Sequence, residues 1–199
     1  MRRLLLALAS VAALTACARR DATPPATTTA TAVPAEERWS LYDLPTTWRD
    51  QRGATVQLDT FSGRPRVLAM VYTNCQATCP LIVADLKRIE ASLPAARRDD
   101  VGFVLVSLDP ERDTPGRLAA WAAATRLDPA RWTLLNGDAD AVRALAAAIG
   151  VRYQAEGADA LAHSNVITVL DADGVMVHQQ LGLGTEAQGT IDAVQRALR

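Results

Sequence analysis

Two apolar runs dominate the pattern of the chain and predict buried strands. Residues 67–73 and 101–109 are almost continuously apolar and rich in Val. Runs of this kind are typical of strands that are covered on both faces of a sheet. Between them, apolar side chains recur at helical spacing through residues 81–93, which predicts a helix. We therefore expect a strand, a helix and a second strand at the centre of the fold.

The same alternation continues to the end of the chain. The further predicted elements are a helix from Thr114-Pro115 to about Arg126, a strand at 132–135, an Ala-rich helix at 139–149, a hairpin of residues 165–171 and 175–180 around an Asp-Gly turn, and a closing helix at 185–198. Together with a β-rich entry, this order indicates an α/β domain with a central mixed sheet and helices on both faces.

The first 38 residues have a different character from the rest. A charged start is followed by an apolar stretch, Leu4–Leu14, that is shorter than the roughly 20 apolar residues that a membrane-spanning helix needs. The sequence Leu14-Thr-Ala-Cys17 resembles a bacterial lipobox. We therefore expect a lipoprotein signal peptide over residues 1–16, a lipidated Cys17, a disordered Ala/Thr/Pro-rich tether over 17–38 and a single domain over 39–199.

These features predict an exported lipoprotein that is anchored to a membrane and faces the periplasm or the cell exterior. The chain contains 3 cysteines, and lipid on Cys17 leaves one pair, Cys75 and Cys79. The formal net charge of −1 and the absence of a basic stripe argue against a nucleic-acid partner.

The cysteine pair is placed for chemistry. Cys75 comes just after the first buried strand, at the predicted start of the next helix, where free N–H groups favour a thiolate. In an ideal helix, positions four apart have Cα atoms about 6 Å apart, so a disulfide requires Cys75 to leave helical geometry. A bound metal tolerates sulfurs about 4 Å apart. The spacing thus favours a reversible dithiol, with a structural disulfide as the alternative.

His163 is the candidate third ligand. It stands directly before a predicted core strand and after a small-residue segment, residues 156–160, that reads as a mobile loop. Two thiolates and an imidazole suit Cu(I), whereas structural zinc would require a fourth ligand. His178 is expected to be an ordinary strand residue. Asp109, at the end of the second strand, is a candidate to sit near the thiols and tune their charge.

Several motifs, in one order along the domain, resemble the Sco/SenC family of thioredoxin-like copper proteins. They are Tyr72-Thr-Asn-Cys-Gln-Ala-Thr-Cys-Pro80, Ser107-Leu-Asp-Pro110 with Arg112-Asp-Thr-Pro115, Trp132-Thr-Leu-Leu-Asn-Gly137, His163-Ser164 and Asp171-Ala-Asp-Gly174. The resemblance implies a thioredoxin-like fold and one copper ion, Cu(I) or Cu(II), bound by Cys75, Cys79 and His163. It also implies a role in maturing the copper centre of cytochrome c oxidase, with a copper-accepting membrane oxidase subunit or another cuproprotein as partner.

Three alternatives remain open beside a copper chaperone. The first is a thiol-disulfide reductase that acts on partner cysteines without bound metal, which is the reaction we expect if the protein is an enzyme. The second is a peroxidase of the peroxiredoxin type, although no Thr or Ser stands three positions before either cysteine. The third is a binding module with an inert disulfide. Gln76 departs from the family, many of whose members have Pro there, which leaves the target less defined than the chemistry.

Overall fold

The computed structural model describes residues 38–156, 160–184 and 187–199. The predicted signal peptide, Cys17 and all of the tether except Arg38 lie outside the described residues. Among the helices of the described part, none is long and apolar enough to cross a membrane.

One mixed sheet organises the domain. Its strands follow the order β2-β1-β5-β4-β3-β8-β9, with β3, β4 and β5 parallel and the outer pairs antiparallel. The strands are β1 (Thr47–Asp50), β2 (Thr55–Gln57), β3 (Arg66–Val71), β4 (Gly102–Ser107), β5 (Trp132–Gly137), β8 (Val166–Leu170) and β9 (Met176–Leu181). A separate two-stranded sheet contains β6 (Tyr153–Glu156) and β7 (Ala160–His163).

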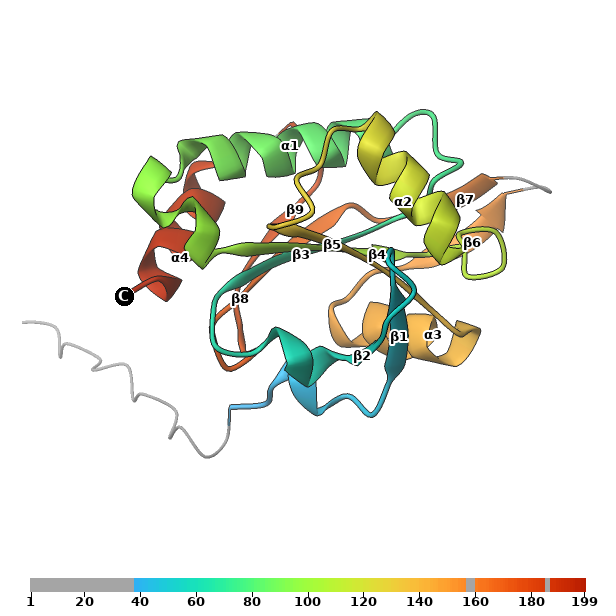
Figure 1. Ribbon diagram of the computed structural model, residues 1–199, viewed down its shortest axis with the longest axis horizontal. Helices are drawn as coiled ribbons and strands as arrows, with labels where there is room; N and C mark the ends of the chain where they lie inside the picture. Colours follow the sequence, from blue (N-terminus) through green and yellow to red (C-terminus); the bar gives the residue numbers. More distant parts are fainter. Residues whose placement is uncertain (1–37, 157–159, 185–186) are drawn as a thin grey trace, which may run out of the picture. The chain divides into compact units, whose positions relative to one another are not determined.

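Helices cover both faces of the sheet, as predicted (Figure 1). Helices α1 (Cys79–Ser92) and α2 (Pro115–Ala124) lie on one side, and α3 (Ala139–Ala148) lies on the other. Helix α4 (Gln188–Ala197) packs beside α1 and against β8 and β9. Short 3-10 segments occupy Leu41–Asp43, Leu58–Phe61 and Ala95–Asp100. This arrangement is the thioredoxin-like fold.

Strands β3 and β4 form the centre of the core, and every residue of both is buried. This explains why their sequences are almost continuously apolar rather than alternating, with Arg66 and Ser107 only at the strand ends. On the neighbouring strand, Trp132 of β5 pairs with Phe103 of β4, and the two rings stack with 4.6 Å between centroids. The hydrophobic centre was therefore readable from the sequence.

The predicted Asp-Gly hairpin is also present between β8 and β9. Gly174 adopts φ +82°, and the Tyr42 ring lies against it where a Cβ would stand. Only glycine combines that backbone conformation with so close an approach. Thr114 caps α2 as predicted, because its hydroxyl accepts the N–H of Arg117.

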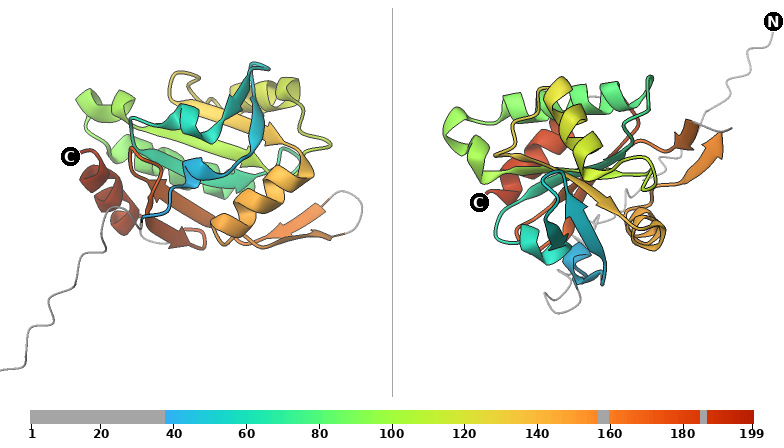
Figure 2. Two further views of the ribbon diagram at one scale, coloured as in Figure 1. Left: turned by 90° about the horizontal axis from the view of Figure 1, so that it is seen from below. Right: turned by 45° about the vertical axis from the view of Figure 1, so that its right-hand side comes forward.

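The β6–β7 hairpin was not predicted. Residues 156–160 read as a mobile loop, yet Glu156 ends β6 and Ala160 begins β7, and four residue pairs from Tyr153↔His163 to Glu156↔Ala160 join the strands. Both views in Figure 2 show this hairpin projecting from the body of the domain on the side away from α4. Small and polar residues such as Gln154 and Ala155 gave no strand-like pattern, because this hairpin buries little apolar surface.

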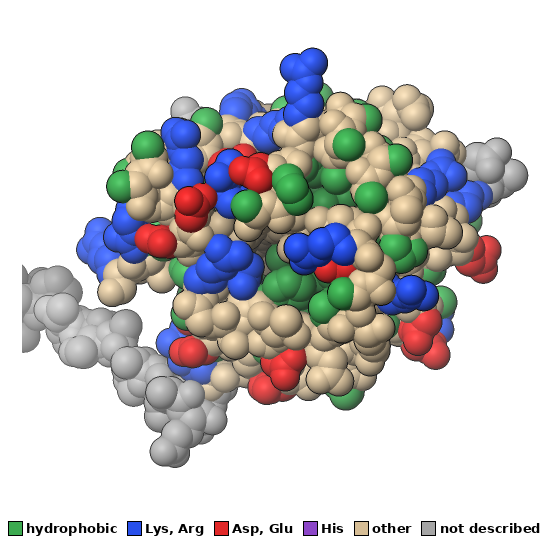
Figure 3. All heavy atoms as spheres, in the orientation of Figure 1, with side chains coloured by type: hydrophobic (Ala, Val, Ile, Leu, Met, Phe, Trp, Pro, Cys, Tyr) green, Lys and Arg blue, Asp and Glu red, His purple; other side chains and the backbone are tan. Residues whose placement is uncertain are grey.

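Charged side chains of both signs are mixed over the face shown in Figure 3. Among the described residues, the guanidinium of Arg131 forms ion pairs with Glu90, Asp99 and Asp128. The charged surface is therefore organised in local ion pairs.

Candidate metal centre

The two cysteines lie where β3 passes into α1. Helix α1 begins at Cys79. Cys75 therefore stands in the loop before the helix, whereas the prediction placed it at the start of the helix. This loop geometry lets Cys75 Sγ accept the N–H of Cys79 at 3.2 Å. The N–H groups in the first turn of a helix have no partner within the helix, so they can donate hydrogen bonds to a sulfur at this position.

The same geometry favours ionisation of Cys75. Burial opposes the charged form, but hydrogen bonds from Thr78, Cys79 and the N–H of Ala77 outweigh it and lower the pKa of Cys75 to about 7. Cys79 behaves in the opposite way, because burial and the neighbouring Cys75 sulfur raise its pKa. In the reduced protein, Cys75 is thus the cysteine of the pair that ionises first, and Cys79 keeps its proton at neutral pH.

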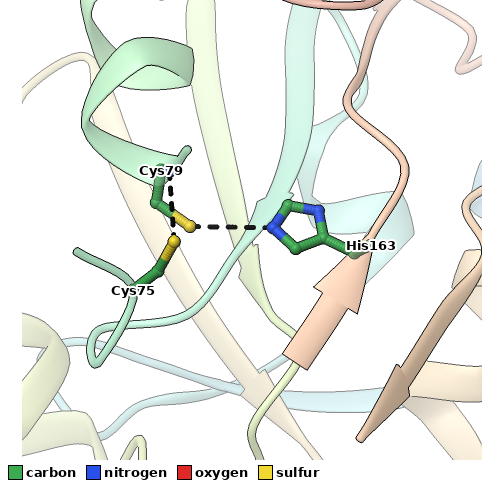
Figure 4. Close-up of side chains that lie close together, drawn as sticks. All are labelled: Cys75, Cys79 and His163. Carbon is green, nitrogen blue, oxygen red and sulfur yellow. Dashed lines mark hydrogen bonds between the residues drawn. The ribbon is translucent and has the colours of Figure 1, made fainter. Parts of the chain in front are cut away.

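His163 ends β7 and directs its ring toward the sulfurs (Figure 4). Its Nε2 lies 3.8 Å from Cys79 Sγ, while Nδ1 lies 3.2 Å from the carbonyl oxygen of Ser164. A carbonyl can only accept a hydrogen bond, so Nδ1 carries the proton and Nε2 presents its lone pair to the thiols. Burial lowers the pKa of His163, which keeps the ring neutral. A neutral imidazole with a free Nε2 is the form that binds a metal.

These three residues bring their ligand atoms together. One sulfur from each cysteine and one ring nitrogen of His163 all lie within 4.8 Å of one another. Among the Cys, His, Asp and Glu side chains that the structure describes, no fourth joins this cluster. A cleft of about 440 Å³ opens over it, lined by Tyr72, residues 74–78, Glu156 and residues 160–163.

Asp109, the sequence candidate for tuning the thiols, does not contribute to the cluster. Its carboxylate accepts Arg112 Nε at 2.6 Å, and its own N–H is bonded to Ser107 Oγ. His178 occupies β9 as an ordinary strand residue, with Nε2 3.2 Å from Thr190 Oγ1. Neither side chain is among the groups that could hold a metal.

Asp113, for which no special role was predicted, is the carboxylate that supports the loop before Cys75. It is fully buried, and it accepts the N–H and hydroxyl of Thr73, at 3.1 and 2.5 Å, and the Ser107 hydroxyl at 2.6 Å. Arg117 adds a bond of 2.8 Å to Thr73 Oγ1. Val71 at the end of β3 pairs with Ser107 at the end of β4, so the residues that follow the two strands lie close to the Asp113 carboxylate. Thr73, two residues before Cys75, is thereby fixed to the strand edge.

A family model matches the sequence of almost the whole domain. The model of SCO1/SenC matches residues 40–199. The chain belongs to the SCO1/SenC family. It is 29% identical over 129 residues to a protein from Stutzerimonas stutzeri described as copper-binding, a match that spans 63% of this chain and 62% of that protein.

Solved structures of the family share the fold. BsSco, a member of the Sco family of cytochrome c oxidase assembly proteins in which a disulfide switch was identified, superposes with a TM-score of 0.68 at 25% identity, covering 81% of this chain and 96% of that one. Bradyrhizobium japonicum ScoI, solved with copper bound, gives a TM-score of 0.61 at 23% identity over 76% of this chain and 96% of that one. The family and the thioredoxin-like fold expected from the sequence are confirmed.

Proposed function

We propose that this protein is a copper chaperone. It holds one copper ion with Cys75, Cys79 and His163 and assists maturation of the copper centre of cytochrome c oxidase. Its partner is then a copper-accepting membrane oxidase subunit or another cuproprotein, to which it passes the ion by ligand exchange.

The observation that carries the proposal is the convergence of two sulfurs and one ring nitrogen within 4.8 Å. Metal–sulfur bonds of about 2.3 Å and metal–nitrogen bonds of about 2.0 Å place three ligands around one ion roughly 4 Å apart. A small contraction of the cluster therefore suffices to surround an ion. Nε2 of His163 already has its lone pair on the side of the sulfurs.

The donor set selects the metal. Thiolate sulfur is a soft ligand that prefers Cu(I), and copper accepts three ligands where structural zinc takes four. Metal binding requires the Cys79 thiol to lose its proton. Because the pKa of this thiol is raised, the positive charge of the metal ion has to stabilise the thiolate that forms. The copper-binding description of the Stutzerimonas stutzeri relative supports the same assignment. BsSco, as a cytochrome c oxidase assembly protein, supports the partner.

The cleft gives the partner access to the ion. Cys75 and His163 both line it, while Cys79 is fully buried behind them. Incoming thiolates therefore meet the ligands of the cleft first, and Cys79 is the last to release the ion. The predicted anchor complements this role: an exported chain tethered through lipid on Cys17 would keep the site near a membrane-bound recipient.

A second function, thiol-disulfide reduction, is favoured by the unequal acidity of the pair. The Cys75 thiolate could attack a partner disulfide to form a mixed disulfide, which Cys79 would resolve. The two cysteines would end as a disulfide, and the partner would gain two electrons and two protons. A pKa of about 7 suits the attacking thiol at neutral pH.

Anaerobic titration with Cu(I) against a competing chelator separates the two functions. We expect the reduced protein to bind one equivalent and the protein with a Cys75–Cys79 disulfide to bind none. If the reduced protein shows no stoichiometric binding but reduces a model peptide disulfide, the reductase replaces the chaperone.

A further inference from the structure

Tyr72 makes an unusual pair of hydrogen bonds to the strand that carries His163. The residue follows β3 directly and is buried. Its hydroxyl donates to the carbonyl oxygen of Leu161 and accepts the N–H of the same residue, each at 3.2 Å. One phenol thus satisfies both backbone groups of a residue in β7.

The position of Leu161 within the hairpin explains what these bonds do. Leu161 is paired with Ala155 of β6 and yet directs its backbone groups to Tyr72. In an antiparallel ladder, alternate residues present these groups to the outer edge, where a further strand would bind. The Tyr72 hydroxyl occupies that edge. It therefore joins the separate β6–β7 sheet to the main domain.

This joint controls the direction of His163. Side chains two residues apart in a strand lie on the same face, so His163 shares its face with Leu161. Leu161 packs against the hydrophobic core, and the ring of Tyr72 meets that of His163 edge-on, with 6.0 Å between centroids and an interplanar angle of 77°. Figure 4 shows the imidazole at the end of β7 pointing toward the cysteines.

Tyr72 is connected to the sulfur side as well. Its own carbonyl oxygen accepts the N–H of Cys75 at 3.2 Å. The backbone of this one residue therefore helps to place the thiolate, while its side chain places the strand of the imidazole.

We infer that Tyr72 is a positioning residue whose hydroxyl sets the distance between His163 Nε2 and the two sulfurs. The inference rests on the proposed copper site, because it assigns Tyr72 an effect on metal binding that is exerted through His163. With the two hydrogen bonds removed, β7 loses its link to the end of β3, and the imidazole leaves the metal position more often.

Tyr72→Phe tests this with the smallest possible change, since only the hydroxyl is lost. We expect Cu(I) affinity to fall about tenfold, a typical effect of removing a group that orients a metal ligand. In the metal-free protein, the Leu161 amide should exchange its hydrogen faster, while amides of β3 and β8 keep their rates. Tyr42→Phe is the matched control. It removes a hydroxyl bonded to the Phe61 carbonyl, away from the thiol cleft, and should change neither measurement.

A double-mutant cycle with His163→Ala decides whether Tyr72 acts through the imidazole. We expect Tyr72→Phe to weaken copper binding in the wild type and to have no further effect when His163 is already Ala. An equal effect in both backgrounds would mean that Tyr72 acts on the thiols or on the core, and would overturn the inference. Wild-type affinity in Tyr72→Phe would also overturn it. If His163→Ala alone leaves copper binding intact, the failure lies in the proposed site instead.

Discussion

The two sides of the candidate metal centre are built very differently. The thiols stand on the central framework: Cys79 opens α1 and is fully buried, and the Cys75 loop follows a strand with no exposed residue. The imidazole stands on a two-stranded hairpin outside the main sheet, whose β6 strand is mostly exposed. The two proposed sulfur ligands therefore stand on the framework, and the proposed nitrogen ligand stands on a hairpin that is joined to it through Tyr72 and Leu161.

The largest effect on copper affinity is expected when a proposed ligand of the framework is removed. Cys79→Ala should weaken Cu(I) binding by more than a hundredfold, because it leaves one thiolate and one imidazole for the ion. The measurement is competition with a Cu(I) chelator under anaerobic conditions. Circular dichroism controls for folding. An affinity within tenfold of the wild type would show that Cys79 is not a ligand.

Removing the buried support of the framework should affect stability as well as the site. Asp113→Ala leaves the Thr73 N–H, the Thr73 hydroxyl and the Ser107 hydroxyl without their acceptor. We expect the free energy of unfolding to fall by about 3 kcal/mol, since each abandoned buried donor costs roughly 1–3 kcal/mol and relaxation recovers part of this. Chemical denaturation measures the change. Asp140→Ala is the control, because its carboxylate lies exposed beside Arg143. Equal stability of both variants would contradict the role given to Asp113.

Removal of the hairpin ligand should affect the metal and spare the fold. His163→Ala is expected to bind Cu(I) about ten- to a hundredfold more weakly, with the unfolding midpoint of the metal-free protein nearly unchanged. Its matched control is His178→Ala, which removes the other histidine, on β9, and should bind copper normally. Equal copper affinity in the two variants would refute the contrast between framework and hairpin.

The smallest expected effect is the pH dependence of Cys75 ionisation, which involves the framework and not the hairpin. The pKa of Cys75 is lowered from 9.0 to about 7, so ionisation of Cys75 favours the folded state. That contribution is complete above pH 9 and is lost as the pH falls through about 7. In the metal-free, reduced protein, alkylation of Cys75 by iodoacetamide should therefore rise with a midpoint near pH 7, with His163→Ala showing a similar curve. A midpoint near 9 would contradict the hydrogen bonding described for this sulfur.

The sequence was most informative about the framework. The apolar runs of β3 and β4 located the centre of the fold, because burial on both faces leaves a continuous hydrophobic signal, and the cysteine spacing pointed to two candidate ligands. His163 could be named from its neighbours and the family motifs. The β6–β7 hairpin that carries His163 could not be predicted. Its strands are held by backbone pairing and by the Tyr72 hydroxyl, and such bonds produce no alternating apolar pattern in the sequence.

The same reasoning explains the two carboxylates. Asp109, at the end of β4, looked closer to the thiols, but it turns to Arg112. Asp113 stands directly before the predicted helix start at Thr114, and only the packing of β3 beside β4 shows that its carboxylate reaches Thr73. Such tertiary bonds between residues 40 apart leave no local pattern in a sequence.

X-ray absorption of the protein loaded with one equivalent of Cu(I) tests the central claim most directly. The account predicts two sulfur ligands at about 2.3 Å and one nitrogen at about 2.0 Å in the wild type, with the nitrogen lost and both sulfurs retained in His163→Ala. A site with no nitrogen in the wild type, or one that keeps its nitrogen in His163→Ala, would contradict it.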